Sequence, residues 1–154
     1  MIEDAIRALL TAPGSATHAL VGGRVYPERL PQPGEGKTSE LPAIVYRVVS
    51  APQEYHHRGP SYLIRARIQL DLATDTYAQA QALREAIRGR RGSPGVLNGR
   101  KARVPVTVAG VERVVSIRRV FVRMERDSGE SDLDNVAASP RGKSLDIEAV
   151  FWET

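Results

Sequence analysis

The sequence predicts an α+β fold in which a mainly antiparallel sheet is flanked by two or more helices. Two segments, one at the N-terminus and one in the middle of the chain, carry apolar residues at the spacing of amphipathic helices. Five other segments are rich in β-branched residues or alternate between apolar and polar residues, as strands do. At 154 residues the chain has the usual length of one domain, so we expect a single domain over residues 1–154.

The N-terminal part of the chain is expected to be helical. The apolar residues of the segment 2–10 share one helical face, and Pro13 and Gly14 supply a stop. A second helical turn can form around residues 15–20, and a brief extended piece follows at 24–27.

The sheet is expected to begin after an exposed loop near residues 28–42, where prolines and glycines lie among polar residues. Residues 43–49 are mostly β-branched and predict a strand that is buried at least partly on both faces. A second exposed loop near 52–61 precedes residues 62–74, where apolar residues alternate with polar ones such as Arg65. The two strands should form an antiparallel hairpin whose loop protrudes.

The second amphipathic helix should begin after Thr74 or Asp75 as its N-cap, with Tyr77, Ala80, Leu83 and Ile87 on one face. Cations near the C-terminus of a helix interact favourably with its dipole, so a basic cluster there predicts no ligand. This helix ends in such a cluster, which consists of Arg88, Arg90 and Arg91.

The last third of the chain predicts three more strands. Residues 104–109 alternate, and Pro105 places their strand at a sheet edge; residues 114–124 form an apolar, arginine-containing strand. After an exposed polar loop near 125–142, residues 145–152 alternate again and should pair inside the sheet, because their inward face is fully apolar. Two acidic residues of this last strand should lie on its outward face as ordinary surface charges, namely Asp146 and Glu148.

Charge and composition narrow the possible functions. Lys and Arg number 22 against 18 Asp and Glu, which gives a net charge of +4 and leaves a small basic nucleic-acid-binding α+β domain as an alternative. The absence of cysteine excludes disulfides and thiolate metal sites. No run of 18 apolar residues and no signal peptide is present, so we expect no membrane association.

No catalytic, metal or cofactor site is evident in the sequence. The histidines lack further ligands at metal spacing, and Asp132-Leu133-Asp134-Asn135 lacks the glycine and glutamate that a calcium loop requires. Neither a G-x-S-x-G elbow nor a complete phosphate-binding loop occurs. We therefore predict that the protein is not an enzyme and needs no cofactor.

Order and spacing of several motifs resemble the tail terminator, or tail-completion, proteins of long-tailed bacteriophages, prophages and gene transfer agents. The resemblance covers nearly the whole chain. The motifs are the helix 2–10 followed by Gly22-Gly23-Arg24-Val25-Tyr26-Pro27, then Leu41-Pro42-Ala43-Ile44-Val45-Tyr46-Arg47, then residues 67–77 leading into Ala80 and Leu83, and finally the closing strand 145–152. Two stretches depart from the family pattern, residues 88–103 and 127–135.

The resemblance implies a structural protein of the virion tail that is assembled in the host cytoplasm. Copies of the chain would form a homo-oligomeric ring, a hexamer, that caps the tail tube, ends its polymerisation and presents a surface to the head connector. Its partners would be itself, the major tail tube protein and the head–tail connector protein, with nucleic acid only passing through the ring. The family supplies no catalytic residues.

Arginines on sheet faces are common anchors at protein interfaces. Three of them are the candidate residues for the charged contacts of such a ring with itself or its partners: Arg65, Arg67 and Arg119.

Overall fold

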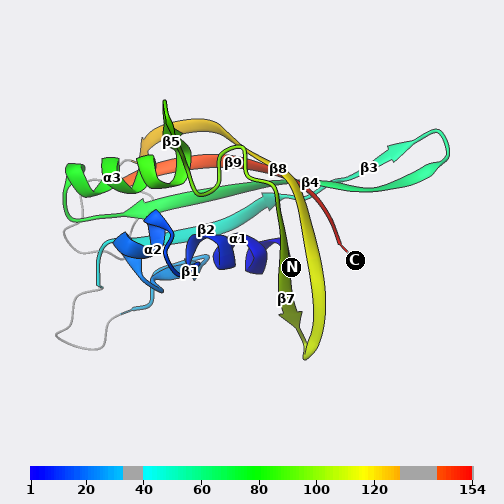
Figure 1. Cartoon of the computed structure of the whole chain (residues 1–154), viewed down its shortest axis with the longest axis horizontal. Helices are drawn as coiled ribbons and strands as arrows, with labels where there is room; N and C mark the ends of the chain where they lie inside the picture. The colour runs from blue at the N-terminus through cyan, green and yellow to red at the C-terminus, as the bar shows by residue number, and fades with distance from the viewer. Residues whose placement is uncertain (33–39, 129–141, 154) are drawn as a thin grey trace.

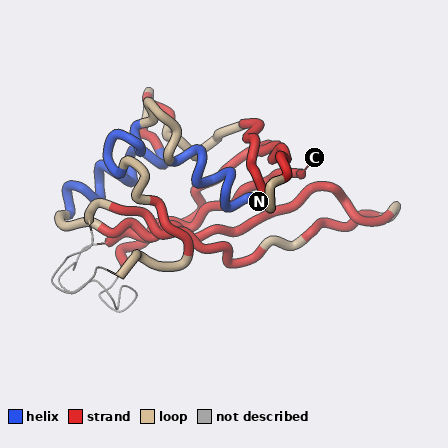
Figure 2. Tube along the Cα trace, turned by 90° about the horizontal axis from the view of Figure 1, so that it is seen from below, coloured by secondary structure: helices blue, strands red, loops and turns tan. Residues whose placement is uncertain are grey.

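The structure is a computed structural model that describes residues 1–32, 40–128 and 142–153. Three helices lie on one face of a large curled sheet, as Figures 1 and 2 show. The buried sides of all three helices and the facing side of the sheet form a single hydrophobic core. The prediction of an α+β fold is therefore confirmed.

The elements follow one another along the chain with short connections in most places. The helices are α1 (Ile2–Leu10), α2 (Ala16–Val21) and α3 (Tyr77–Arg88). The strands are β1 (Val25–Pro27), β2 (Ala43–Ser50), β3 (Gln53–His56), β4 (Gly59–Ala73), β5 (Gly89–Arg90), β6 (Ser93–Pro94), β7 (Ala102–Val108), β8 (Val111–Ser128) and β9 (Gly142–Glu153).

The large sheet has the strand order β1-β2-β4-β9-β8-β7, and β3 adds a further pairing to β4. It is a mixed sheet, because β1 runs parallel to β2 and pairs Val25 with Ile44. This corrects the expectation of a mainly antiparallel sheet. A parallel pair needs a long connection that returns the chain to its starting end, and the segment 28–42 between β1 and β2 supplies it.

Several predicted strands occur where the sequence placed them. β9 lies inside the sheet between β4 and β8, and β7 forms an edge strand that contains Pro105. β4 buries Ala66 and Ile68 on the core side, while Arg65 and Arg67 lie on the other face. The alternation in the sequence thus identified correctly which face of the sheet packs against the helices.

Three expectations about local structure were wrong or need adjustment. The expected loop near 52–61 is mostly strand, because β3 and the start of β4 form an extended ribbon. Thr76, not Thr74 or Asp75, caps α3 by accepting a hydrogen bond from the backbone N–H of Gln79 at 3.2 Å. In the expected loop near 125–142, β8 continues to Ser128 and β9 begins at Gly142, while residues 129–141 lie outside the described residues.

The turn between α1 and α2 is held by side-chain hydrogen bonds. The hydroxyl of Ser15 caps α2 by accepting the backbone N–H of His18 at 3.1 Å. The buried hydroxyl of Thr17 donates to the carbonyl of Leu10 at 2.6 Å and so satisfies one of the free carbonyls at the end of α1. Both short helices are thereby fixed to each other as well as to the core.

Candidate assembly interface

The sheet face opposite the helices carries a group of arginines that we call the arginine face. The candidates Arg65 and Arg119 lie in line across three strands, because both are register partners of Val150 in β9. Arg67 is two residues along β4 from Arg65, on the same side of the strand. The structure therefore brings all three candidates to one face. The arginine face consists of Arg47, Arg65, Arg67, Arg119, Arg123 and Arg126.

Carboxylates lie beneath these arginines. Asp146 is paired with Arg67, with 2.7 Å between Oδ2 and Nη2, and its side chain is only 4% exposed against 55% for Arg67. Arg126 approaches the other carboxylate oxygen of Asp146 at 3.9 Å. Glu148 accepts from Arg123 at 2.9 Å. These contacts correct the expectation that Asp146 and Glu148 are ordinary surface charges, since both are tied to arginines and Asp146 is buried.

Asp71 of β4 is a third acid on this face, beside Asp146 and Glu148 of β9. Its carboxylate accepts hydrogen bonds from Arg47 at 3.1 Å, from Gln69 at 2.9 Å and from the hydroxyl of Ser144 at 2.8 Å. The side chain of Asp71 is buried, so these donors replace the water that the charge would otherwise need. Burial of the acids under longer arginine side chains leaves guanidinium groups, not carboxylates, at the surface.

Arg65 holds the root of the β3–β4 ribbon. Its guanidinium pairs with Glu54 of β3 and, at 3.4 Å, with Glu148 of β9, while its backbone N–H donates to the carbonyl of Pro52. The hydrogen bond from Arg123 lowers the pKa of Glu148, an effect that exceeds the opposing effect of burial. The side chain of Arg65 is about half exposed, so its outer side remains open to a partner.

Arg119 is held differently from the other two candidates. Its guanidinium lies 5.5 Å from the centre of the Phe121 ring, and Arg123 lies 4.9 Å from the same ring. Arg119 is exposed, and within residues 1–32, 40–128 and 142–153 it has no carboxylate partner. Of the three candidates, Arg119 therefore has the most donors free to bind an external anion.

Sequence reasoning did not select Arg47, Arg123 and Arg126 as site residues. Arg47 follows β-branched residues in β2, and its position opposite Gln69 depends on the strand register. Arg123 sits at an irregularity of β8, between Val122 and Met124, where simple alternation fails. The strict two-residue period of β4 shows which of its residues share a face. In β8 the bulge interrupts that period, so the sequence does not show on which face Arg123 lies.

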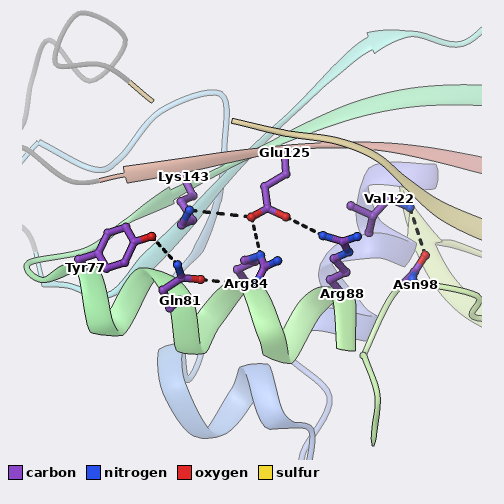
Figure 3. A network of polar contacts seen from close by, with 8 residues as sticks. All are labelled: Tyr77, Gln81, Arg84, Arg88, Asn98, Val122, Glu125 and Lys143. Carbon is purple, nitrogen blue, oxygen red and sulfur yellow. Dashed lines mark hydrogen bonds and ion pairs between the residues drawn. The ribbon is translucent and has the colours of Figure 1, made fainter. Parts of the chain in front are cut away.

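On the helix side of the sheet, a second polar network links α3 to the ends of β8 and β9 (Figure 3). Glu125 of β8 pairs with Arg84 at 2.5 Å, Arg88 at 2.9 Å and Lys143 at 3.9 Å. Burial would raise the pKa of Glu125, but the ion pair with Arg84 and the hydrogen bond from Arg88 together outweigh it, and the pKa is lowered. Arg88, which was expected to interact with the helix dipole, thus also pairs with the carboxylate of Glu125.

Within residues 1–32, 40–128 and 142–153, no group of three or more His, Cys, Asp or Glu side chains is arranged to hold a metal ion. In the same residues, no helix is both long and apolar enough to cross a membrane.

Comparisons with known proteins agree with the fold. A chain in the solved structure of the virion of a native gene transfer agent particle shares 17% sequence identity with this protein. The similarity covers 98% of this chain and 94% of that chain, with a TM-score of 0.66, so the two share a fold. No curated protein matches the sequence. A family model described as tail completion protein gp17 matches residues 4–136, which is most of the chain. The protein therefore belongs to the tail completion protein gp17 family and is a structural protein of the virion tail.

Proposed function

We propose that copies of this chain form a ring, a hexamer, that caps the tail tube. The ring would end polymerisation of the tube and present the surface that joins the tail to the head connector. Its partners would be neighbouring copies, the major tail tube protein and the connector protein, and its role would be structural, with no catalytic step. Family membership and the arginine face are the two observations that support this proposal.

The arginine face is the observation that carries the proposed contacts. The buried carboxylates of Asp71 and Asp146 hold Arg47 and Arg67, and Arg119 lies against the ring of Phe121, so a partner has less to order on binding. Arginine groups at interfaces pair with carboxylates in defined geometry and are frequent anchors of binding energy. We propose that Arg65, Arg67 and Arg119 contact a neighbouring copy or a tail partner through such pairs.

Nucleic-acid binding is the alternative that the exposed guanidinium groups favour. Among the described residues, however, the six arginines lie over four carboxylates, Glu54, Asp71, Asp146 and Glu148, which leaves an excess of two positive charges. Binding to a phosphate backbone depends on releasing many counterions and needs a stronger positive field. A protein partner with spaced carboxylates fits the mixed charge better. A gel-shift titration at low salt tests the alternative, and no shift would exclude it.

Electron microscopy of tubes polymerised from the tube protein tests the capping role. We expect tubes made with this chain to be shorter than tubes made without it and to end in a ring. Arg119→Glu should weaken capping, because it places a negative charge on the proposed contact surface. Arg113→Glu is the matched control, since Arg113 is exposed and pairs in register with the core-side residue Val106. Unchanged lengths and bare ends with the wild-type chain would refute the proposal.

A further inference from the structure

The two edges of the large sheet are protected against pairing with another chain. β1 at one edge has only three residues and ends at Pro27, and β7 at the other edge contains Pro105. Short strands and prolines are common ways to prevent unwanted edge-to-edge association. A strand pair elsewhere in the protein that lacks such protection is therefore a candidate for contact with another chain.

One such pair is the ribbon of residues 53–63, which we call the arm. Figures 1 and 2 show it extending beyond the rest of the sheet. β3 pairs only with β4, and β4 pairs with β9 only from Ile64 onward, so within the described residues the arm has no third strand. A two-stranded ribbon is marginally stable in water by itself. The arm is thus a surface that gains stability when another molecule covers it.

The arm also carries the two most exposed tyrosines among the large apolar side chains described. Tyr55 is 75% exposed and Tyr62 is 88% exposed. Tyrosine is enriched at protein interfaces, because it combines a large apolar ring with a hydroxyl group. The ion pair of Arg65 with Glu54 fixes the root of the arm, so docking the arm would cost less entropy than ordering a free loop.

A hollow with complementary chemistry lies elsewhere on the same chain. It has a volume of about 680 Å³ and lies between residues 9–16, where α1 leads into α2, and residues 94–101. Fully buried Leu97 anchors the second wall in the core, and the backbone N–H of Gly99 donates to the carbonyl of Val120 at 2.8 Å. Both walls are held by the core, so the hollow is formed before a partner arrives.

The lining of the hollow suits an aromatic side chain. Leu9 and Val96 supply apolar surface, and Arg100 and Lys101 supply exposed cations. In the described part of the chain, no carboxylate is paired with Arg100 or Lys101. A cation next to a tyrosine ring gains a favourable cation–π interaction, which is stronger when water is displaced.

We propose that the arm of one copy docks into the hollow of the next copy, with Tyr55 or Tyr62 against the cations of the hollow. The arm projects from one end of the long axis, and α2, whose first residue Ala16 lines the hollow, lies well away from it (Figure 1). Two different surfaces of one chain that fit each other produce a head-to-tail interface, which closes into a ring when the rotation between copies allows it. The inference rests on the proposed ring and names the contact that builds it.

Cross-linking tests this contact independently of tube capping, because the chain contains no cysteine. His57→Cys places one thiol on the arm, and Ala16→Cys places another at the hollow. With a short bis-maleimide and assembled protein, the double variant should give a ladder of multiples of one chain. An equal mixture of the two single variants should stop at the dimer, because each chain then carries only one thiol. The control pair Val111→Cys with Ala16→Cys should give no ladder.

Two substitutions give a second readout. Tyr55→Ser with Tyr62→Ser should reduce the ladder and the fraction of capped tube ends by about tenfold or more, as expected for interface anchors. Its thermal unfolding should match the wild type, since both side chains are exposed. Val111→Ser, also on an exposed strand end, should change neither readout.

The results separate this inference from the proposed function. Capped tubes without the ladder, or with arm-to-arm or arm-to-tube-protein products, would overturn the docking inference and leave the capping proposal intact. A ladder on protein that leaves tubes uncapped would support the docking contact and refute capping.

Discussion

Arg67 and Asp146 form an ion pair between neighbouring strands in which the carboxylate is buried and the guanidinium is about half exposed. The pair shows how this protein presents positive charge on a sheet face without an uncompensated charge in its interior. The acid fixes the arginine, and the arginine keeps its remaining donors toward the surface. The two partners should therefore respond unequally to substitution.

Removing Arg67 should cost more stability than neutralising Asp146. Among the described residues, Arg67→Ala leaves the buried carboxylate with the 3.9 Å contact to Arg126 as its remaining ion pair, and we expect a loss of about 2–3 kcal/mol in the free energy of unfolding. Asp146→Asn leaves an arginine that water can solvate, so we expect about 1 kcal/mol. Urea denaturation measures both values. The control Arg119→Ala breaks no ion pair in the described residues, so its free energy of unfolding should stay within about 0.5 kcal/mol of the wild type. Equal losses for Arg67→Ala and Asp146→Asn would contradict this account.

Glu125 should make stability depend on pH in the acid range. Its folded-state pKa is lowered from 4.5, so its contribution is fully present above the unfolded-state pKa and is lost as the pH falls through the folded-state pKa. The difference in unfolding free energy between wild type and Glu125→Gln should therefore be largest above about pH 5 and shrink below it. Denaturation curves at several pH values measure it. A difference that stays constant down to the lowest pH at which the protein folds would disprove the linkage.

Gly95 should tolerate no side chain. A Cβ atom there would lie 2.3 Å from backbone atoms of Ile87, Arg88 and Gly89, where α3 ends. Gly95→Ala must shift the backbone, and we expect a loss of about 2 kcal/mol or more in the free energy of unfolding. Gly99→Ala is the control. Its φ of +75° is strained for alanine, but no atom lies within 4 Å of the added Cβ, so its cost should be about 1 kcal/mol. Thermal unfolding ranks the two variants, and the reverse order would show that the backbone contact is not limiting.

Capping of tail tubes should weaken as salt rises, because the proposed contacts of the arginine face are charged and lie at the surface. At about 0.5 M salt the screening length falls to a few ångströms, compared with about 10 Å at 0.1 M. We expect fewer capped ends at high salt and a smaller salt effect for Arg119→Ala, which removes one of the contacts. Tube-end counts by electron microscopy measure this. If the wild type and Arg119→Ala lose the same fraction of caps, Arg119 takes no part in the contact.

Hydrophobic periodicity by itself determined the helices α1 and α3, the alternation of β4 and the central place of β9. These patterns are local, and each is fixed by which residues must leave water. The same reasoning selected Arg65 and Arg67, because a strict period of two shows which residues share a face. The order of several motifs also indicated the family correctly.

The residues that Arg65, Arg67 and the other arginines contact were decided only by the tertiary structure. The burial of Asp146 depends on arginines brought to it by β4 and β8, and the bulged register of β8 places Arg119 in line with Arg65. The parallel pairing of β1, the strand pairing of β3 with β4 that makes the predicted protruding loop an arm, and the hollow beside residues 94–101 arise in the same way. Each depends on contacts between residues far apart in the chain, and the free energy of such contacts is set by register and packing, which no local pattern encodes.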